Sequence, residues 1–373
     1  MKKIVYILHG LASGGTENFV LNVVRRLDKT QYDISFILAV DDDNVQFLES
    51  EALDEGVRIY KACDLDGIFK KVKYCMLLYR LLKETGEYDV VHSNMDMFNG
   101  VNLAIAKAAG IKKRISHSHI SHSQYAVKPL RKLMVLPYQH IMRILIKKFS
   151  TLRLGCSQKA NVYLYGEKWS MDDNTSVLYN GIDIDKFMNP GIDKSQFMKG
   201  ISMDPDKINI ATVGRISAPK NPLFIVEIIN ELSKINKNFC FTWVGKGEME
   251  SQVRDLINKN GISKYFNFLG TRRDIPEILN CCDIFMLPSL FEGLSISLIE
   301  AQAAGLDCFI SSTIQSEVDA GKCIALDLEK GAQFWAEKIN EHISAETEKC
   351  LDMEKLSKFN VVNTVEALEE IYI

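Results

Sequence analysis

The feature that most constrains the fold of this sequence is a regular alternation of short apolar runs with stretches of helical periodicity. The runs are continuous rather than alternating with polar residues, which is typical of strands buried on both faces of a parallel sheet. They lie at residues 4–8, 33–40, 89–93, 208–213, 239–244 and 283–288. A helical pattern follows the first run, with an apolar stripe at Phe19, Val20, Val23, Val24 and Leu27. The alternation predicts an α/β fold with parallel sheets.

The alternation occurs in two series, which suits two domains better than one core for a chain of 373 residues. We expect a first domain at residues 1–178, a second domain at residues 179–350 and a helical segment at residues 351–373. Residues 178–207 are largely polar and are predicted to contain the linker.

The composition is that of an ordinary globular protein, with 47% hydrophobic and 25% charged residues. A net charge of −3 gives no indication of nucleic-acid binding. The nine cysteines are scattered and form no CxxC pair, which argues against a disulfide framework or a zinc site. We find no signal-peptide pattern, and no apolar stretch approaches the ~20 residues of a membrane span. A cytoplasmic location is therefore expected.

A strand, a polar turn and a helical pattern follow one another between residues 283 and 305. The free backbone N–H groups and the dipole at such a helix start favour a bound anion. Glu292 in the turn and Glu300 in the helix lie eight residues apart. Two interpretations of Glu300 stay open: contact with a ligand whose phosphates lie at the helix start, or a capping box formed with Ser297.

Glycines follow several predicted strands, and Arg215 and Lys220 follow one of them. The carboxyl ends of parallel strands meet at one edge of a sheet, which is where α/β proteins bind ligands. Two cations beside the helix start after Ser289 would form a pyrophosphate site that needs no metal. The glycine-rich loop after the first strand, at Gly10 to Gly15, does not have the GxGxxG spacing of a dinucleotide site.

Histidines gather in the first half of the chain, where His92 ends one predicted strand and His117 and His119 end another. Alternate spacing places His117 and His119 on one face of their strand. A metal pair would use this spacing, but no third ligand lies near in sequence, so ligand contact or polar packing is favoured. The three aspartates at residues 41–43 are interpreted as a solvated loop rather than a metal-binding acidic pair.

The stretch at residues 112–153 contains ten basic residues and no acidic residue. Apolar positions between the charges make it amphipathic, although Pro137 interrupts the pattern. Two interpretations stay open: contact with anionic lipid headgroups, or a helix whose apolar side is core and whose charges are solvated. Nucleic acid is not indicated, because aromatic residues are not interleaved with the charges.

Together the motifs resemble those of the retaining glycosyltransferases of the GT-B type, the large family called family 4 or glycosyl transferases group 1. Glu292 to Glu300 resembles the E-x7-E element of that family. The other motifs, in the family's order, are Gly14-Gly15-Thr16-Glu17, Asn180-Gly181-Ile182-Asp183, Gly214-Arg215 with Lys220-Asn221, Val244-Gly245-Lys246-Gly247 and Phe268-Leu269-Gly270. Residues 114–119 further resemble the branch that builds capsular polysaccharides and exopolysaccharides.

The resemblance implies two Rossmann-like domains facing across a cleft, with a nucleotide sugar held mainly by the second domain and the final helical segment returning to the first. Arg215 and Lys220 would clamp the diphosphate, Glu300 would accept hydrogen bonds from the ribose, and Glu292 would hold the donor sugar. The remaining donor-side contacts implied by the resemblance are Gly14, Gly15, Gly245, Thr271, Arg272, Gly293, Leu294 and Ser295. His92, His117 and His119 would lie on the acceptor side, with His117 near the reacting sugar.

The activity implied by the resemblance is transfer of a hexose-type sugar, with retention, from a nucleotide diphosphate sugar, expected to be a UDP-sugar, to a glycan or lipid-linked acceptor. Neither a metal nor a further cofactor is expected, and the enzyme would work at the inner face of the cell membrane. A non-catalytic nucleotide-sugar sensor or partner subunit and a UDP-sugar epimerase stay open as alternatives. Asn221 and Leu294 depart from the family pattern, in which glycine and phenylalanine are frequent.

Overall fold

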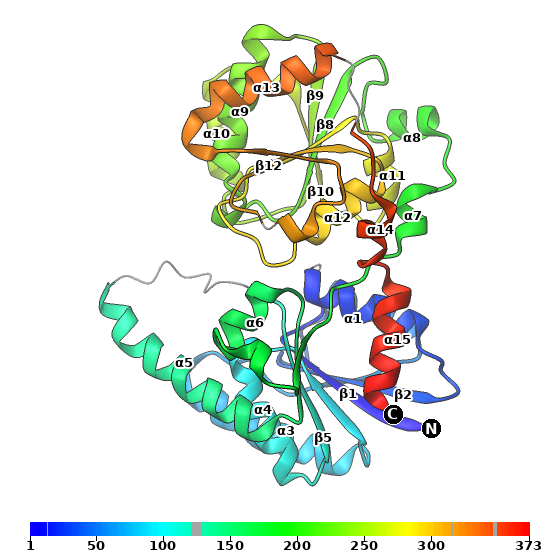
Figure 1. Ribbon diagram of the computed structural model, residues 1–373, viewed down its shortest axis with the longest axis vertical. Coiled ribbons are helices and arrows are strands. Elements are labelled where there is room, and N and C mark those ends of the chain that lie inside the picture. Colours follow the sequence, from blue (N-terminus) through cyan, green and yellow to red (C-terminus); the bar gives the residue numbers. More distant parts are fainter. Residues whose placement is uncertain (13, 121–128, 315, 346–348) are drawn as a thin grey trace. The chain divides into compact units, whose positions relative to one another are not determined.

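The chain forms two compact units in the computed structural model (Figure 1), which describes residues 1–12, 14–120, 129–314, 316–345 and 349–373, without the side chains of 129–134. Unit 1 comprises residues 1–181 and 361–373, and unit 2 comprises residues 182–360. The chain therefore passes between the units twice.

Unit 1 is built on a seven-stranded sheet in the order β3-β2-β1-β4-β5-β6-β7, in which every pair of neighbours is parallel. Its strands are β1 (Lys2–Leu8), β2 (Tyr32–Leu38), β3 (Arg58–Lys61), β4 (Val90–Ser93), β5 (Lys113–Ser118), β6 (Leu152–Gly155) and β7 (Thr175–Val177). Its main helices are α1 (Gly15–Arg26), α2 (Glu49–Asp54), α3 (Gly67–Glu84), α4 (Asn99–Ala108), α5 (Pro129–Phe149), α6 (Gln158–Tyr165) and α15 (Val361–Tyr372).

Helices cover both faces of this sheet, as alternation along β1 makes clear. Ile4, Tyr6 and Leu8 pack in one core with residues of α1 and α15. Val5 and Ile7 point to the other face and pack with residues of α3 and α4. The continuous apolar run that predicts β1 is therefore explained by burial on both sides.

Unit 2 has a six-stranded parallel sheet in the order β10-β9-β8-β11-β12-β13. Its strands are β8 (Ile208–Val213), β9 (Phe239–Val244), β10 (Phe266–Gly270), β11 (Ile284–Leu287), β12 (Asp307–Ser311) and β13 (Cys323–Leu326). Its helices are α7 (Ile184–Met188), α8 (Lys194–Gly200), α9 (Pro222–Ile235), α10 (Glu250–Lys259), α11 (Ile275–Asn280), α12 (Ile296–Ala303), α13 (Gly331–Ala345) and α14 (Met353–Ser357).

The core on one face of this second sheet is rich in aromatic residues. Residues of α9, α10 and α13 pack there around Phe241 and Trp243 of β9 and the fully buried Trp335. Two parallel sheets with helices on both faces confirm the predicted α/β fold.

The unit boundaries differ from the predicted ones. The first unit ends at Gly181 rather than at residue 178, and α15 begins at Val361. Residues 182–207, predicted as linker, contain α7 and α8 and belong to unit 2. Gly181 belongs at the close of unit 1 because a Cβ there would lie 2.4 Å from the Cα of Val361, so only glycine lets these two backbones meet.

None of the helices described in the structure is both long enough and apolar enough to cross a membrane. Within the same residues, no cluster of three or more His, Cys, Asp or Glu side chains is arranged to hold a metal ion.

Candidate functional site

Most of the predicted donor residues lie in the loops at the carboxyl ends of β8, β9 and β11, which are neighbours in the sheet of unit 2. The loop after β8 carries Gly214, Arg215 and the short 3-10 helix η3 (Ala218–Lys220), and the loop after β11 leads to α12. The sheet therefore brings together residues that are up to 86 positions apart, from Gly214 to Glu300.

The glycines after β8 and β9 allow these two loops to touch through their backbones. A Cβ on Gly245 would lie 2.2 Å from the carbonyl oxygen of Gly214, and one on Gly247 would lie 2.2 Å from that of Ile216. Gly214 and Gly245 also have positive φ angles, of 153° and 135°. Gly245, predicted as a donor contact, has in this structure a clear role in packing the loops.

An ion pair joins the loop after β8 to the loop after β11. Lys220 Nζ donates to Glu292 Oε1 over 2.7 Å, and Ser289 Oγ donates to the same oxygen over 2.6 Å. The backbone N–H of Leu290 donates to the carbonyl of Pro219 over 2.8 Å, so the two loops are also joined through their main chains. The structure thus places Lys220 and Glu292, predicted to contact different parts of one ligand, directly against each other.

The residue after Lys220 explains one departure from the family pattern. Asn221 has φ 54° and ψ 51°, in the left-handed region, and precedes Pro222 at the first position of α9. Glycine adopts this conformation without strain, and asparagine is among the side chains that tolerate it best. Asn221 can therefore form the same left-handed turn after Lys220 that glycine would form.

Arg215 offers a second cation at this edge. Its side chain is exposed and makes no hydrogen bond or ion pair with any residue that the structure describes. A guanidinium group stays charged and suits a phosphate, because its N–H groups match two oxygens at once.

A capping box formed by Ser297 and Glu300 requires Ser297 to be the N-cap residue, but the helix after β11 begins before Ser297. Ser295 is the N-cap of α12, the helix starts at Ile296, and no side chain caps its first turn. Ser297 lies inside the helix, so the capping-box interpretation is wrong. Ser295 itself is buried, and its hydroxyl has no hydrogen-bond partner in the part of the chain that the structure describes.

Glu300, on the second turn of α12, has no hydrogen-bond or ion-pair partner among the described residues. Burial raises the pKa of its carboxyl group from 4.5 to about 7. A partly buried carboxyl group without a donor costs free energy, so this side chain has an unused capacity to accept hydrogen bonds. Leu294, two positions before the helix start, is buried, and the adjacent Gly293 is partly exposed.

The loop after β10 holds Thr271 and Arg272. Thr271 is exposed. Arg272 is engaged locally, because its guanidinium makes two hydrogen bonds to Asp274, over 2.8 and 2.5 Å. The backbone of this loop, rather than the Arg272 side chain, is left for the predicted contact with the base.

In unit 1, Gly14 is the N-cap of α1 and Gly15 is its first residue. The carbonyl of Gly14 accepts hydrogen bonds from the backbone and the side chain of Asn18, over 3.1 and 2.9 Å. A Cβ on Gly14 would lie 2.3 Å from a carboxylate oxygen of Glu17. The three nearest atoms all belong to the flexible Glu17 side chain, so this contact alone does not exclude a side chain at Gly14.

The three histidines do come together in unit 1, but His92 and His117 are fully buried. His92 Nε2 lies 3.1 Å from His117 Nδ1, and the ring centroids of His117 and His119 are 4.1 Å apart. Both ring nitrogens of His92 are hydrogen-bonded, the second to Tyr372 over 2.8 Å. His92 is thus a core residue with both ring nitrogens hydrogen-bonded, and His117 Nε2 and His119 Nδ1 are buried atoms as well.

Burial, reinforced by the neighbouring imidazoles, lowers the pKa of His92 to about 3 and the pKa of His117 well below its usual value. Burial likewise lowers the pKa of His119 to about 3, and the Asn180 side chain opposes this shift. All three rings are therefore neutral near pH 7.

Two residues beside this cluster were not identified from the sequence. Asp96 has a positive φ of 48°, and burial raises the pKa of its carboxyl group to about 7. Tyr372 reaches His92 across 280 positions in the sequence, a contact that no local pattern indicates. An acidic residue in the loop after an apolar strand, as Asp96 is three residues after the end of β4, is a signal that could have been used.

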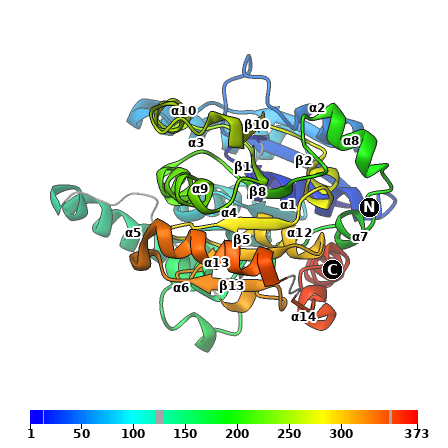
Figure 2. The same cartoon turned by 90° about the horizontal axis from the view of Figure 1, so that it is seen from above.

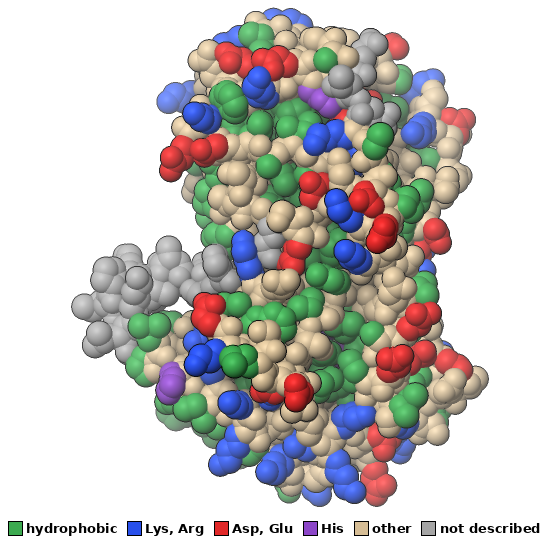
Figure 3. All heavy atoms as spheres, in the orientation of Figure 1, with side chains coloured by type: hydrophobic (Ala, Val, Ile, Leu, Met, Phe, Trp, Pro, Cys, Tyr) green, Lys and Arg blue, Asp and Glu red, His purple; other side chains and the backbone are tan. Residues whose placement is uncertain are grey.

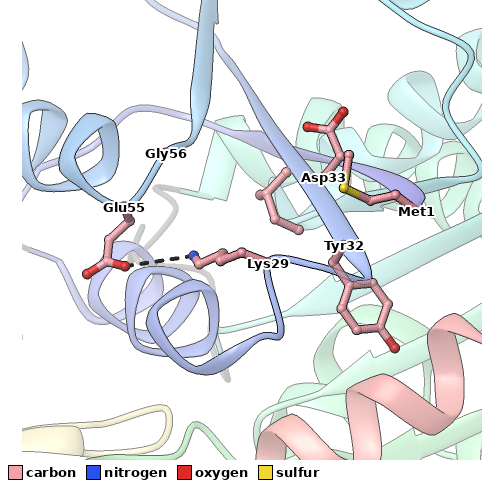
Figure 4. Close-up of a pocket in the computed structure, with 7 residues that line it drawn as sticks. Met1, Lys29, Tyr32, Asp33, Glu55 and Gly56 are labelled. Carbon is pink, nitrogen blue, oxygen red and sulfur yellow. Dashed lines mark ion pairs between the residues drawn. The ribbon is translucent and has the colours of Figure 1, made fainter.

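A pocket of about 220 Å³ lies elsewhere in unit 1, and Figure 4 shows the side chains that line it. Lys29 Nζ faces Glu55 across 3.8 Å, and Tyr32 and Asp33 come from the start of β2. This pocket is therefore at the amino ends of the strands, opposite the edge that carries the histidines and Gly14. A second pocket, of about 310 Å³, is similarly placed in unit 2, near the start of β8.

Two family models match the chain. Residues 13–186 match the model described as Glycosyltransferase Family 4, and residues 207–345 match the model described as Glycosyl transferases group 1. The matched segments fall almost entirely in unit 1 and unit 2 respectively.

Relatives match over nearly the whole chain. The chain is 29% identical over 342 residues to EpsF of Bacillus subtilis (strain 168), named as a glycosyltransferase, covering 91% of this chain and 87% of that one. It is 27% identical over 378 residues to the UDP-Gal:alpha-D-GlcNAc-diphosphoundecaprenol alpha-1,3-galactosyltransferase of Escherichia coli, covering 96% and 93% of the two chains.

The fold is also that of solved glycosyltransferases. HepE of Anabaena, solved in complex with UDP and glucose, superimposes with a TM-score of 0.79 at 17% identity, covering 99% of both chains. Sequence motifs, fold and relatives agree, and the chain belongs to the GT-B glycosyltransferases, with a family 4 domain followed by a group 1 domain.

Proposed function

We propose that this glycosyltransferase moves a hexose from a UDP-sugar to a lipid-linked saccharide, with retention of the anomeric configuration, in cell-surface polysaccharide synthesis. The observation that carries the proposal is the unpartnered, partly buried carboxyl group of Glu300 on α12. The two adjacent hydroxyl groups of a ribose would supply the donors that this group lacks. The diphosphate would then lie toward the start of α12.

The charges around that helix start suit a diphosphate. Arg215 is an unpaired cation among the described residues, and Lys220 is held by Glu292 at 2.7 Å. In the transfer, the bond between the sugar C1 and the leaving phosphate oxygen breaks, and the acceptor oxygen bonds to C1 on the same face. The acceptor proton passes to the leaving phosphate oxygen, while Arg215 and Lys220 stabilise its charge. The protein would need no metal for this step.

The lipid-linked acceptor is supported by the E. coli relative, whose name specifies a sugar on diphosphoundecaprenol. The UDP-sugar donor is supported by the same name and by the UDP complexes of the Anabaena enzyme. We infer that this protein meets its acceptor at the inner face of the cell membrane.

A surface for such contact lies on α3 and α5, which flank α4 on one face of the sheet of unit 1. On α5, Ile141 and Ile144 are 52% and 51% exposed, and Lys147 and Lys148 lie in the next turn. On α3, Phe69, Val72 and Met76 are 88%, 53% and 62% exposed. Their spacing places them on one side of the helix, turned away from the core.

The segment of the chain that carries α3 and α5 also has an excess of positive charge. Residues 67–149, from α3 to α5, contain 15 Lys and Arg but only four Asp and Glu, in a chain whose net charge is −3. Figure 3 shows cationic side chains among hydrophobic ones on the part of unit 1 that carries α5. Figure 2 shows the start of α5 projecting from the rest of that unit. Exposed apolar residues among cations suit an anionic lipid surface.

Transfer is tested with purified protein, a panel of UDP- and GDP-sugars and a lipid-linked acceptor. The donor is first selected by thermal shift, since a ligand at 100 times its Kd adds about 2.7 kcal/mol to the free energy of unfolding. The expected result is UDP released in equal amount to the extended acceptor, with retained configuration by NMR and unchanged rates in EDTA. Donor binding without UDP release would instead identify a nucleotide-sugar sensor, and an epimerised free sugar would identify an epimerase.

A further inference from the structure

Lys220 and Glu292 form an ion pair beside the start of α12, where the proposed function places a diphosphate. Lys220 Nζ lies 2.7 Å from Glu292 Oε1, and the two side chains are only 20% and 11% exposed. Glu292 is the one acidic partner of Lys220 among the residues that the structure describes. Because solvent and salt screen a partly buried pair less than a surface pair, each charge offsets much of the other.

Glu292 is held in this position by more than the lysine. Ser289 Oγ donates to the same carboxylate oxygen over 2.6 Å. The carbonyl of Ser289 accepts hydrogen bonds from Ser311 Oγ, over 2.5 Å, and from Thr313 Oγ1, over 3.0 Å. Ser289 and Ser311 are fully buried, and Ser311 is the last residue of β12. The carboxylate is therefore fixed to the sheet independently of Lys220.

The lysine, in contrast, is attached through a flexible stem. Lys220 is the last residue of η3, and its side chain passes over Gly214. A Cβ on Gly214 would lie 3.1 Å from Lys220 Cε and 3.6 Å from Lys220 Nζ, so glycine leaves room for the stem. The ammonium group at the end of this stem can turn from one neighbouring anion to another.

The position of Glu292 opposes the binding of an anion at the helix start. Glu292 lies three residues before Ser295, the N-cap of α12. A diphosphate there is attracted by the backbone N–H groups and by Lys220, but it is repelled by the carboxylate. UDP and Glu292 are thus two anions beside one ammonium group. A UDP-sugar differs from UDP because its sugar brings hydroxyl groups, which can donate to a carboxylate in place of a lysine.

We infer that Glu292 competes with the diphosphate for Lys220, so that the enzyme retains a UDP-sugar but releases UDP. A UDP-sugar serves both partners of the ion pair, because its phosphate takes the ammonium group and its sugar hydroxyls take the carboxylate. Once the sugar has moved to the acceptor, the carboxylate loses those donors and takes Lys220 back from UDP. This role in product release rests on the proposed function and extends it beyond the transfer step.

Calorimetric titration of the natural protein and Glu292→Gln tests the competition, with UDP, the UDP-sugar selected by thermal shift, and inorganic pyrophosphate as ligands. Glutamine keeps an oxygen for Lys220 and Ser289 but removes the charge. We expect UDP and pyrophosphate to bind about tenfold more tightly to the variant, the effect of one close charge pair. The UDP-sugar should gain less, because the variant offers its hydroxyl groups a weaker acceptor.

Glu248→Gln is the matched control for the change in net charge. Glu248 is exposed in the loop after β9, at the same edge of the sheet, and makes no ion pair with any residue that the structure describes. Its charge is screened at physiological salt, so the control should change the UDP affinity by less than about twofold.

Unchanged or weaker UDP binding by Glu292→Gln overturns the inference, as does an equal gain in Glu248→Gln. An equal gain for UDP and the UDP-sugar also overturns it, because the sugar would then play no part. Glu292→Asp draws the carboxylate back from Lys220 and should give a smaller gain for UDP, which decides the matter if the Gln variant does not fold. A natural protein that binds neither UDP nor a UDP-sugar would overturn the proposed function, whereas the pyrophosphate titration would still test the competition.

Discussion

At the scale of single residues, the site in unit 2 contains a lysine that is held in an ion pair and a carboxyl group that has no partner among the described residues. Lys220 is paired with Glu292, whereas Glu300 has no partner among the described residues. The sequence could indicate that these residues share one edge, because they follow neighbouring parallel strands. It could not indicate the ion pair, since contact between side chains depends on the turn at Asn221 and on the bond from Leu290 to Pro219.

Lys220→Ala tests the cation at the leaving phosphate. We expect kcat to fall about 100- to 1,000-fold, the range for loss of one electrostatic donor in a transition state. The variant also removes the ion pair between Lys220 and Glu292, so the free energy of unfolding should fall by about 1–3 kcal/mol. Steady-state kinetics and urea unfolding measure the two effects. Lys259→Ala, an exposed lysine at the end of α10, should change neither, and normal turnover in Lys220→Ala would contradict the assignment.

Glu300→Gln should have opposite effects on stability and on UDP binding. The pKa of Glu300 is raised to about 7 in the folded protein against 4.5 in a free side chain, so the folded state holds the extra proton between these values. Ionisation therefore makes the natural protein less stable as the pH rises from about 5 to 8, by up to about 3 kcal/mol. The Gln variant should escape this loss yet bind UDP more weakly.

Unfolding at pH 5 and pH 8 and calorimetric titration with UDP measure these two effects. The matched control is Glu354→Gln on α14, where the side chain is exposed. A stability difference between Glu300→Gln and the natural protein that does not change with pH would contradict the expectation, as would unchanged UDP affinity.

At the scale of elements, apolar runs predicted strands in both sheets, because burial on both sides leaves a simple apolar run. Periodicity alone cannot tell which side is buried where a helix has two apolar sides. On α3, Tyr74, Leu78 and Leu82 face the core while Phe69, Val72 and Met76 are exposed. The sequence contains both stripes, and only the packing of α3 against the sheet tells which one is buried.

Gly245→Ala tests the contact between the loops after β8 and β9. The new Cβ would meet a backbone carbonyl at 2.2 Å, so the loop has to move, and we expect a loss of about 2 kcal/mol or more. Gly261→Ala is the matched control, because Gly261 also has a positive φ, of 67°, but nothing lies within 4 Å of its Cβ position. Its cost should be limited to backbone strain of about 1–2 kcal/mol. Equal losses in urea unfolding would show that the contact is unimportant.

At the scale of the whole molecule, the two series of alternating elements were enough to predict two α/β units. The division at Gly181 and Val361 was not predicted, because it depends on the pairing of Ile182 with Asn360, which are 178 positions apart. The basic stretch at residues 112–153 could be read from the sequence, but the exposure of apolar residues on α3 required the structure.

Membrane contact is tested by flotation with vesicles of phosphatidylglycerol or phosphatidylcholine. We expect the protein to float with the anionic vesicles, and to do so less at high salt, because its cations are screened there. Phe69→Ser with Met76→Ser should weaken flotation at least tenfold, since two large apolar side chains no longer enter the interface. Leu53→Ser is the control: Leu53 is 54% exposed on α2, on the opposite face of the same sheet. Equal flotation of all variants would contradict this surface.

The return of α15 to unit 1 has a consequence for the order in which the protein can fold during its synthesis. Val361, Val365, Leu368 and Tyr372 complete the core beneath α1, but they are translated after every residue of unit 2. Unit 2 can close its own core as soon as it leaves the ribosome. Unit 1 must wait with the apolar side of β1 uncovered, so the half of the protein that is made first is finished last.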